Sequence, residues 1–376
     1  MDEKNNDVKR KYSRTLEAEK SAFLRFFNRT VRKIIVLNQE NVNNMPHGRM
    51  IVCCTHRSHL DYIILGLKIP EFGADQIRFA AGDNLTRIPM LGKLFRSVGA
   101  FSVYRGRSSQ KSYITRLADQ IKLMVASGDS VIVFPEGGRS YSGRMLDIKS
   151  GILAAGVLAQ KDDAKKSVYY LPLAINYTKI PDLRAFSLLL TGRNLRDNKK
   201  NAFLKFSGTF IYYFADVWVF LTSWIFNIRT DVVLNVGKPT ALSEITDVEN
   251  KFSAAARSPI VANRDSINEC SQWVGKQLNR LFPILPINAI AYLLDNFGVG
   301  GCNEKNLEKI IKDLKDLGLY VNLLEADSAK NIIKDGIKAL KENGVIRKYF
   351  RISIKRKKRL KYFADFINSY FNENGE

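Results

Sequence analysis

Between about residue 50 and residue 237, six short β-rich runs alternate with helical stretches, and few fold classes accommodate that order. The runs read IVCCTH (51–56), IRFAAG (77–82), FSVYRG (101–106), VIVFPEGG (131–138), YYLPLAIN (169–176) and DVVLNVG (231–237). Strands that alternate with helices favour an α/β fold, with a mixed, largely parallel sheet flanked by helices. Ligands bind such sheets where strands end and loops begin, so we look for a site there.

The segments on either side of this alternation are predicted to be helical. In the first, apolar residues at 24, 27, 31 and 34–35 recur at spacings of three and four, which favours a charged arm leading into a helix. The second begins after about residue 282, with an apolar stretch (285–298), amphipathic helices near 304–317 and 327–343, a short strand near 345–354 and a final helix near 361–373. We expect three parts: an N-terminal helical arm (1–45), an α/β domain (46–282) and a small helical, basic C-terminal domain (283–376).

Composition narrows the class of protein further. The chain has 376 residues, 45% of them hydrophobic, which excludes a disordered protein or a small disulfide-stapled domain. Its 59 Lys and Arg against 37 Asp and Glu give a net charge of +22, which suits an anionic partner. The four cysteines have no metal-like spacing, so we expect reduced packing residues, no metal and a cytosolic compartment. The first residues lack an apolar run, so we expect no secretory signal peptide.

Two segments suggest contact with a membrane. Residues 206–228 contain nine aromatic residues and one charge, Asp216; as a helix they would extend about 35 Å, enough to cross a bilayer. They are either a helix pair of the folded domain or a membrane-contacting insert, and we favour insertion into one leaflet. Residues 347–361 contain nine basic residues and no acidic one. This run fits an anionic lipid surface, a solvated face or nucleic acid.

A histidine and a carboxylate lie five positions apart at the end of the first β-rich run. The chain has three histidines, His47, His56 and His59, and Asp61 follows His56 in HRSHLD. A carboxylate bound to one ring nitrogen fixes the tautomer and leaves the other nitrogen to act as a general base. Alternatively, Ser58 and Asp61 form a capping box for the following helix, and the two roles are compatible. We expect His59 to be structural.

A second candidate follows the run VIVFPEGG. Adjacent glycines, Gly137 and Gly138, let a backbone approach a ligand and direct N–H groups at an anion, and Arg139 offers a planar fork suited to phosphate. The segment lacks the Gly-Lys-Ser/Thr ending of a nucleotide-binding loop, and an ordinary Gly-Gly turn is the alternative. Glu136 would stabilise the turn or hold a substrate hydroxyl.

Two further residues are candidates for the site only because they occur together with these two motifs. Arg105 follows a strand and would point from its end toward the site. Pro172 interrupts a strand-like run, which suggests a sheet edge or a bulge beside the site.

Taken together, in this order and spacing, these pieces resemble the four sequence blocks of the glycerolipid acyltransferase family. The blocks read HRSHLD (56–61), GAFSVYRG (99–106), FPEGGRS (134–140) and YLPLAIN (170–176). Their wording is most similar to the glycerol-3-phosphate 1-acyltransferase branch. The resemblance covers about residues 45–300, and it finds no counterpart for 206–228 or for the long N-terminal region of the large bacterial enzymes.

The resemblance implies a reaction and a set of roles. An acyl chain would pass from acyl-CoA or acyl carrier protein to the sn-1 hydroxyl of glycerol 3-phosphate, giving lysophosphatidate without a cofactor. The base would be His56, oriented by Asp61. The residues implied in substrate binding are Arg105, Glu136, Gly137, Gly138, Arg139, Ser140 and Pro172. The protein would work at the cytoplasmic face of a membrane, as a peripheral or monotopic protein, and we expect it to bind no nucleic acid.

Two rival functions stay open at this point. One is a related acyltransferase that uses dihydroxyacetone phosphate or a lysophospholipid and keeps the same catalytic residues. The other is a basic membrane- or nucleic-acid-binding protein whose working part is the C-terminal region. Acyl-chain length, donor and oligomeric state are not predicted.

Overall fold

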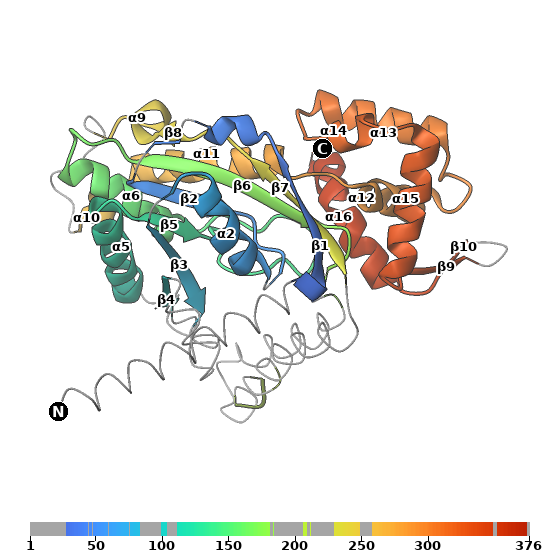
Figure 1. The fold of residues 1–376 in the computed structure, drawn as a ribbon, viewed down its shortest axis with the longest axis horizontal. Coiled ribbons are helices and arrows are strands. Elements are labelled where there is room, and N and C mark those ends of the chain that lie inside the picture. Colours follow the sequence, from blue (N-terminus) through green and yellow to red (C-terminus); the bar gives the residue numbers. More distant parts are fainter. Residues whose placement is uncertain are drawn as a thin grey trace, which may run out of the picture.

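The computed structural model shows a twisted sheet with helices on both faces and a helical C-terminal region packed beside it (Figure 1). It describes residues 28–43, 45–46, 48–58, 60–74, 76–82, 99–103, 111–180, 183, 206–208, 211, 229–248, 258–348 and 352–373. The sheet has eight strands, seven of them in the order β1-β7-β6-β2-β5-β3-β4, with β8 beside β6. Only the pairs β6–β7 and β6–β8 are antiparallel. The predicted mixed, largely parallel sheet is therefore confirmed.

All six β-rich runs form strands of this sheet. The strands are β1 (Val31–Leu37), β2 (Met50–Cys54), β3 (Ile77–Gly82), β4 (Ala100–Val103), β5 (Ser130–Val133), β6 (Tyr169–Tyr177), β7 (Thr230–Val236) and β8 (Thr240–Ala241). Along β2, Ile51 and Cys53 face one hydrophobic core, whereas Val52 and Cys54 face the other. This period of two places a buried layer on each face of the sheet.

Different helices cover the two faces. One core contains residues of α5 (Lys111–Ala126), α6 (Ser150–Asp162) and α11 (Arg264–Leu281). The other contains residues of α2 (Leu60–Glu71) and of the C-terminal helices. Three short helices also occur in this part of the chain: η1 (Gln39–Val42), α9 (Leu242–Ile245) and α10 (Pro259–Ala262).

The helical prediction for the N-terminal region is wrong for residues 31–37. These residues, VRKIIVL, form strand β1, which pairs in parallel with β7 at the edge of the sheet. β-Branched residues favour a pleated surface, and β7 offers a row of backbone partners that a sequence period does not reveal. The Arg32 guanidinium and the Asp231 carboxylate form an ion pair between the two strands.

The C-terminal elements match their predictions closely. They are α12 (Pro286–Phe297), α13 (Glu304–Asp316), α14 (Asn322–Glu325), α15 (Ala329–Glu342), β9 (Ile346–Lys348), β10 (Ile352–Ile354) and α16 (Lys357–Glu373). The single strand expected near 345–354 is an antiparallel pair, β9 with β10. One hydrophobic core runs from the sheet, at Val52 and Leu173, to Ile290 and Phe363 of these helices. The C-terminal region therefore packs directly against the part of the sheet that carries the site.

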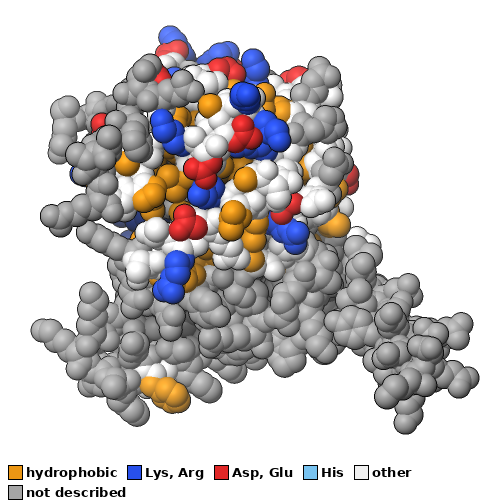
Figure 2. Space-filling view, turned by 90° about the vertical axis from the view of Figure 1, so that its left-hand side faces the viewer, with side chains coloured by type: hydrophobic (Ala, Val, Ile, Leu, Met, Phe, Trp, Pro, Cys, Tyr) orange, Lys and Arg blue, Asp and Glu red, His pale blue; other side chains and the backbone are white. Residues whose placement is uncertain are grey.

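The surface over α5, α6 and α10 carries no patch of one charge. Figure 2 shows Lys, Arg, Asp and Glu side chains interspersed with hydrophobic ones on this side of the molecule. One pair there, Lys122 on α5 and Asp162 on α6, has its nitrogen and oxygen 2.8 Å apart. Among the described residues of this face, positive and negative side chains are therefore mixed.

Most of the aromatic segment 206–228 lies outside the described residues, so its predicted membrane contact stays a prediction. Within the described part of the chain, no helix combines the length and the apolar character needed to cross a membrane.

Candidate active site

The predicted histidine and carboxylate lie at the carboxyl edge of the sheet. His56 follows β2, and Glu136 follows the adjacent parallel strand β5, so both emerge at the same edge. Thr55 extends the pairing of β2 with β6 past the end of the strand: its backbone N–H donates to the Leu173 carbonyl, and its hydroxyl accepts from the Ile175 N–H at 2.9 Å. His56 therefore projects from a fixed backbone.

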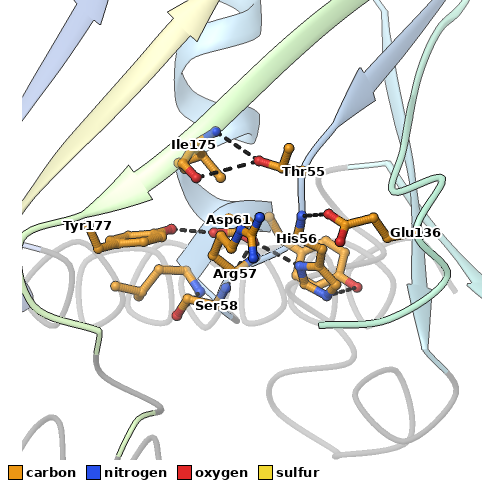
Figure 3. Close-up of polar contacts among 10 residues, drawn as sticks. Thr55, His56, Arg57, Ser58, Asp61, Glu136, Ile175 and Tyr177 are labelled. Carbon is orange, nitrogen blue, oxygen red and sulfur yellow. Dashed lines mark hydrogen bonds and ion pairs between the residues drawn. The ribbon is translucent and has the colours of Figure 1, made fainter. Parts of the chain in front are cut away.

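His56 and Asp61 form a buried hydrogen-bonded pair (Figure 3). The distance from His56 Nδ1 to Asp61 Oδ2 is 2.8 Å, and the two residues are 1% and 0% exposed. A carboxylate only accepts, so Nδ1 carries the hydrogen and Nε2 has the lone pair that can take a proton. The geometry is that of a general base with its orienting group.

The capping interpretation holds as well. The Ser58 N–H donates to Asp61 Oδ2 at 3.0 Å, and the Ser58 hydroxyl accepts from the Leu60 N–H at 3.2 Å at the start of α2. The Arg57 N–H also donates to Asp61 Oδ2, at 2.7 Å. One carboxylate thus orders the first turn of the helix and holds the imidazole, so the two hypotheses describe one arrangement.

Glu136 connects two loops by accepting hydrogen bonds from their backbone N–H groups. Its Oε1 accepts the His56 N–H at 3.0 Å and its Oε2 accepts the Leu146 N–H at 2.9 Å, and the residue is 2% exposed. Burial raises the pKa of this carboxyl, while the Arg57 charge and the two backbone N–H groups act against the rise. Both oxygens are engaged by backbone, which favours the stabilising role of Glu136 over a grip on a substrate hydroxyl.

Aromatic rings enclose the imidazole. Phe134 stacks on it with ring centroids 4.3 Å apart, and Tyr62 meets it edge-on at 5.3 Å. The Tyr62 hydroxyl lies 3.5 Å from His56 Nε2. These walls limit rotation of the ring and lower the local dielectric, which strengthens its contact with Asp61.

Arg57 braces the loop that follows the Gly-Gly segment. Its guanidinium is buried, donates to the carbonyl of Gly143 at 3.2 Å, and lies over the Phe282 ring at 4.6 Å. Ser140 belongs to the same loop: its N–H donates to the His56 carbonyl at 3.4 Å and its hydroxyl accepts from the Gly143 N–H at 3.1 Å. Arg139 is buried, with its guanidinium 5.6 Å from the centre of the Tyr141 ring.

The two adjacent glycines differ. Gly137 has φ +68°, which side chains rarely adopt, and a Cβ there would lie 3.2 Å from the Lys149 side chain. Gly138 has no such φ, and a Cβ there would have nothing within 4 Å. The turn therefore requires glycine at 137, whereas no atom of the described residues occupies the space beside the backbone of Gly138.

Pro172 sits at a break between two neighbouring strands. On one side of β6, β8 pairs with Tyr169 and Tyr170, and β7 pairs from Leu173 onward. Strand β6 lies inside the sheet, so the predicted sheet edge at Pro172 is wrong. Pro172 lies between the two ladders, where its carbonyl accepts from the Gly237 N–H at 2.9 Å and, having no N–H, it donates no bond in return. The residue of β6 that contacts the histidine–carboxylate pair is instead Tyr177, whose hydroxyl donates to Asp61 Oδ1.

The structure thus brings His56, Asp61, Glu136 and Ser140 together and places Gly137 and Arg139 on the loop beside them. Arg105, His47 and His59 lie outside the described residues. Sequence reasoning missed Tyr177 and the bracing role of Arg57. Tyr177 directly follows the run that contains Pro172 and is the last residue of β6, so the rule that sites form at strand ends could have found it.

The environment of the four cysteines disfavours the reactive thiolate form. Burial raises the pKa of all four thiols, to about 12 for Cys270. A neutral thiol attacks a thioester poorly, which favours direct attack by the acceptor. Among the described residues, no group of three or more His, Cys, Asp or Glu could hold a metal ion.

Comparisons with known proteins agree with this geometry. The Acyltransferase family model matches residues 33–176, which span β1 to β6. Glycerol-3-phosphate acyltransferases from Pseudomonas aeruginosa and Xanthomonas axonopodis pv. citri are 26% identical over 80% of this chain and 30% identical over 58% of it. The matched regions are 34% and 23% of those relatives, so the chain spans only about a quarter to a third of the length of the curated proteins that it matches.

A solved structure, that of the 1-acyl-sn-glycerophosphate acyltransferase PlsC from Thermotoga maritima, is 19% identical. It covers 70% of this chain and 78% of its own, with a TM-score of 0.34. The family match spans the strands that carry the histidine–carboxylate pair: residues 33–176 of the chain are similar to the acyltransferase family, and most of the chain is similar to glycerol-3-phosphate acyltransferases.

Proposed function

We propose that this protein transfers a fatty acyl chain from acyl-CoA or acyl carrier protein to the sn-1 hydroxyl of glycerol 3-phosphate, giving lysophosphatidate. The observation that carries the proposal is the buried His56–Asp61 pair, with Nδ1 bound to the carboxylate and Nε2 left as the base. Relatives similar in sequence are named glycerol-3-phosphate acyltransferases, which supports glycerol 3-phosphate as the acceptor.

The reaction needs one proton acceptor and no cofactor. Nε2 of His56 takes the proton of the acceptor hydroxyl as the oxygen attacks the thioester carbonyl carbon. The carbon–sulfur bond then breaks, and the leaving thiolate takes the proton from the imidazolium. The Asp61 carboxylate stabilises the imidazolium between these steps. A base of this kind typically contributes about 10² to 10⁴ in rate.

For the acceptor phosphate we propose Arg139 and Ser140, together with Arg105 from the strand end after β4. Support comes from the loop geometry: the open space at Gly138 adjoins Arg139, and β4 is parallel to β3, so its carboxyl end lies at the same edge of the sheet as His56. A guanidinium fork suits phosphate oxygens.

We further propose that the protein works on the cytoplasmic side of a membrane with an anionic surface. Five of the basic side chains after β10 are exposed and Arg359 is half-buried; the exposed ones are Lys355, Arg356, Lys357, Lys358 and Lys361. Three lysines lie in the first turns of α16, next to the positive end of the helix dipole. Positive charge is unfavourable there, so these lysines do not stabilise the helix. Anionic lipid attracts such clusters, and the lysophosphatidate product partitions into the same surface.

The test measures acyl transfer from a labelled acyl-CoA to glycerol 3-phosphate by detergent-purified protein, with the product analysed for acyl position. Wild type and His59→Ala should form lysophosphatidate acylated at sn-1, whereas His56→Ala should lose at least about 10²-fold in rate. Retained transfer in His56→Ala would overturn the mechanism. Dihydroxyacetone phosphate, a lysophospholipid and an acyl carrier protein donor, each supplied separately, identify the related activities. No product with any of them would overturn the acyltransferase proposal.

A further inference from the structure

We propose that Tyr177 is a positioning residue for the His56–Asp61 pair: its phenol fixes the second oxygen of the Asp61 carboxylate and thereby sets the direction and the basicity of the imidazole. The inference rests on the proposed acyl transfer for its kinetic consequence, but its structural content concerns the pair itself.

The two oxygens of Asp61 are held from different parts of the chain. Oδ2 receives the His56 ring N–H and the backbone N–H groups of Arg57 and Ser58, all from the segment that precedes α2. Oδ1 receives the hydroxyl of Tyr177, which is 116 positions away in the sequence. In Figure 3 the phenol approaches Asp61 from the side opposite to His56. The carboxylate is thus clamped between its own loop and the sheet.

Tyr177 itself is rigidly placed. It is the last residue of β6, where it pairs with Val232 of β7, and it is fully buried. Its N–H donates to the Asn176 side chain at 2.8 Å, and the Asn176 amide donates to the Pro283 carbonyl at 2.9 Å and to Asn288 at 3.0 Å. These contacts connect the end of β6 to the C-terminal helices. Because Tyr177 lies in a buried strand, its phenol has little freedom to move and holds the carboxylate plane of Asp61 in one orientation.

The direction of the electronic effect follows from charge. A hydrogen bond to the carboxylate draws negative charge away from the oxygen that faces the imidazole. Removing the phenolic hydroxyl leaves more charge on Asp61, stabilises the imidazolium and raises the pKa of His56. Among the described residues, the other charged or titratable groups seen to face the pair are Glu136, Arg57, Tyr62 and the Cys54 thiol. None of them is altered by a change at Tyr177, so the shift would isolate its contribution.

The substitution Tyr177→Phe tests this role, and Tyr170→Phe is its matched control. Tyr170 lies on the same strand, is also fully buried, and donates its hydroxyl to the Leu153 carbonyl at 2.7 Å in the other core. Both variants lose the buried hydrogen bond that the phenolic hydroxyl donates, to Asp61 in one case and to the Leu153 carbonyl in the other. Loss of stability alone therefore affects the two alike, whereas loss of positioning affects only Tyr177→Phe.

Two readouts separate positioning from stability. In proteins labelled with ¹³C-histidine, the three histidine signals are titrated by NMR, with His56→Ala to assign the site. We expect the pKa of His56 to rise by about half a unit or more in Tyr177→Phe and to stay unchanged in Tyr170→Phe. In acyl transfer, kcat of Tyr177→Phe should fall about tenfold with KM for glycerol 3-phosphate unchanged, and the acidic limb of the pH profile should move to higher pH.

A second variant protects the test against misfolding of Tyr177→Phe. Replacing Tyr177 by 3,5-difluorotyrosine keeps the ring and makes the hydroxyl a stronger donor, so the pKa of His56 should shift downward. An unchanged pKa of His56 in both Tyr177 variants, with kcat equal to that of Tyr170→Phe, would overturn the inference. If wild type transfers no acyl chain, the proposed function fails, and the NMR titration still decides whether Tyr177 positions the pair.

Discussion

Glu136 Oε1 accepts the backbone N–H of His56 at 3.0 Å, so the residue that follows β5 fixes the backbone of the base that follows β2. The second oxygen accepts the Leu146 N–H and closes the intervening loop. A carboxylate that holds two backbone donors in a buried place controls geometry more than it contacts substrate. The first prediction follows from this contact.

We expect Glu136→Gln to lower both stability and kcat. An amide has one oxygen, so one of the two backbone N–H groups would face an NH₂ group and stay unsatisfied, at a cost of about 1–3 kcal/mol. Urea unfolding measures the loss of stability, and kcat measures the displacement of His56. The control is Glu71→Gln at the end of α2, whose 58% exposed side chain pairs with Lys68. It should change stability by less than about 0.5 kcal/mol. Equal effects of the two substitutions would contradict the assigned role of Glu136.

The raised pKa of Glu136 predicts a specific dependence on pH. Between the ordinary value of 4.5 and the raised value, the folded state binds a proton that the unfolded state has released. The stabilisation that this group gives the folded state is therefore largest below pH 4.5, the pKa of the unfolded state. It decreases as the pH rises from 4.5 through the raised pKa of the folded state. The difference in stability between wild type and Glu136→Gln should decrease with pH across that window. A difference that increases with pH would show that the pKa is lowered instead.

The positions of six strands along the chain and the chemistry at their ends could be predicted from the sequence because both are local patterns, whereas the order of the strands within the sheet was not predicted. Runs of β-branched residues ended at His56 and Glu136, and a parallel sheet brings such ends to one edge. The spacing of Ser58 and Asp61 was compatible with both a cap and a base, and the structure contains both. Strand β1 could not be predicted, since its stability comes from pairing with β7, about 200 positions away.

The parts of the site that escaped prediction depend on contacts between distant segments. Tyr177 reaches Asp61 only because β6 lies beside β2, and Arg57 is useful only because the loop at Gly143 folds over it. Neither residue type signals such a role by itself. The role of Glu136 was open between a turn and a substrate contact, and only its two backbone partners favour the first.

We expect Gly137→Ala and Gly138→Ala to separate folding from acceptor binding. Alanine at 137 must adopt a left-handed backbone beside Lys149, which should cost about 1–2 kcal/mol of stability. Alanine at 138 meets nothing within 4 Å, so stability should change little. If the acceptor phosphate approaches the backbone there, Gly138→Ala raises KM for glycerol 3-phosphate. An unchanged KM in a stable Gly138→Ala would place the phosphate elsewhere.

Acyl transfer should resist thiol reagents. Cys53, Cys54 and Cys270 are buried with raised pKa values, so only the half-buried Cys302 should react in the native protein. Mass spectrometry after treatment with N-ethylmaleimide at pH 7.5 should find one modified thiol at most and full activity, and four modified thiols after unfolding. Rapid inactivation that follows modification of Cys54 would revive an acyl-enzyme route. Cys302→Ser is the control for effects of surface modification.

The last prediction concerns the basic segment before and within the start of α16. Changing Lys355, Lys357 and Lys358 to Gln should weaken binding to phosphatidylglycerol vesicles by at least about tenfold, because each basic residue near an anionic surface contributes about 1 kcal/mol. The loss should shrink as salt is raised, since screening removes the same attraction. The control variant changes the same number of exposed lysines on α13, where acidic residues intervene: Lys305, Lys309 and Lys312. Both variants lower the net charge equally, so a local site predicts a loss in the first alone. Equal losses would mean that the protein responds to lipid only through its total charge.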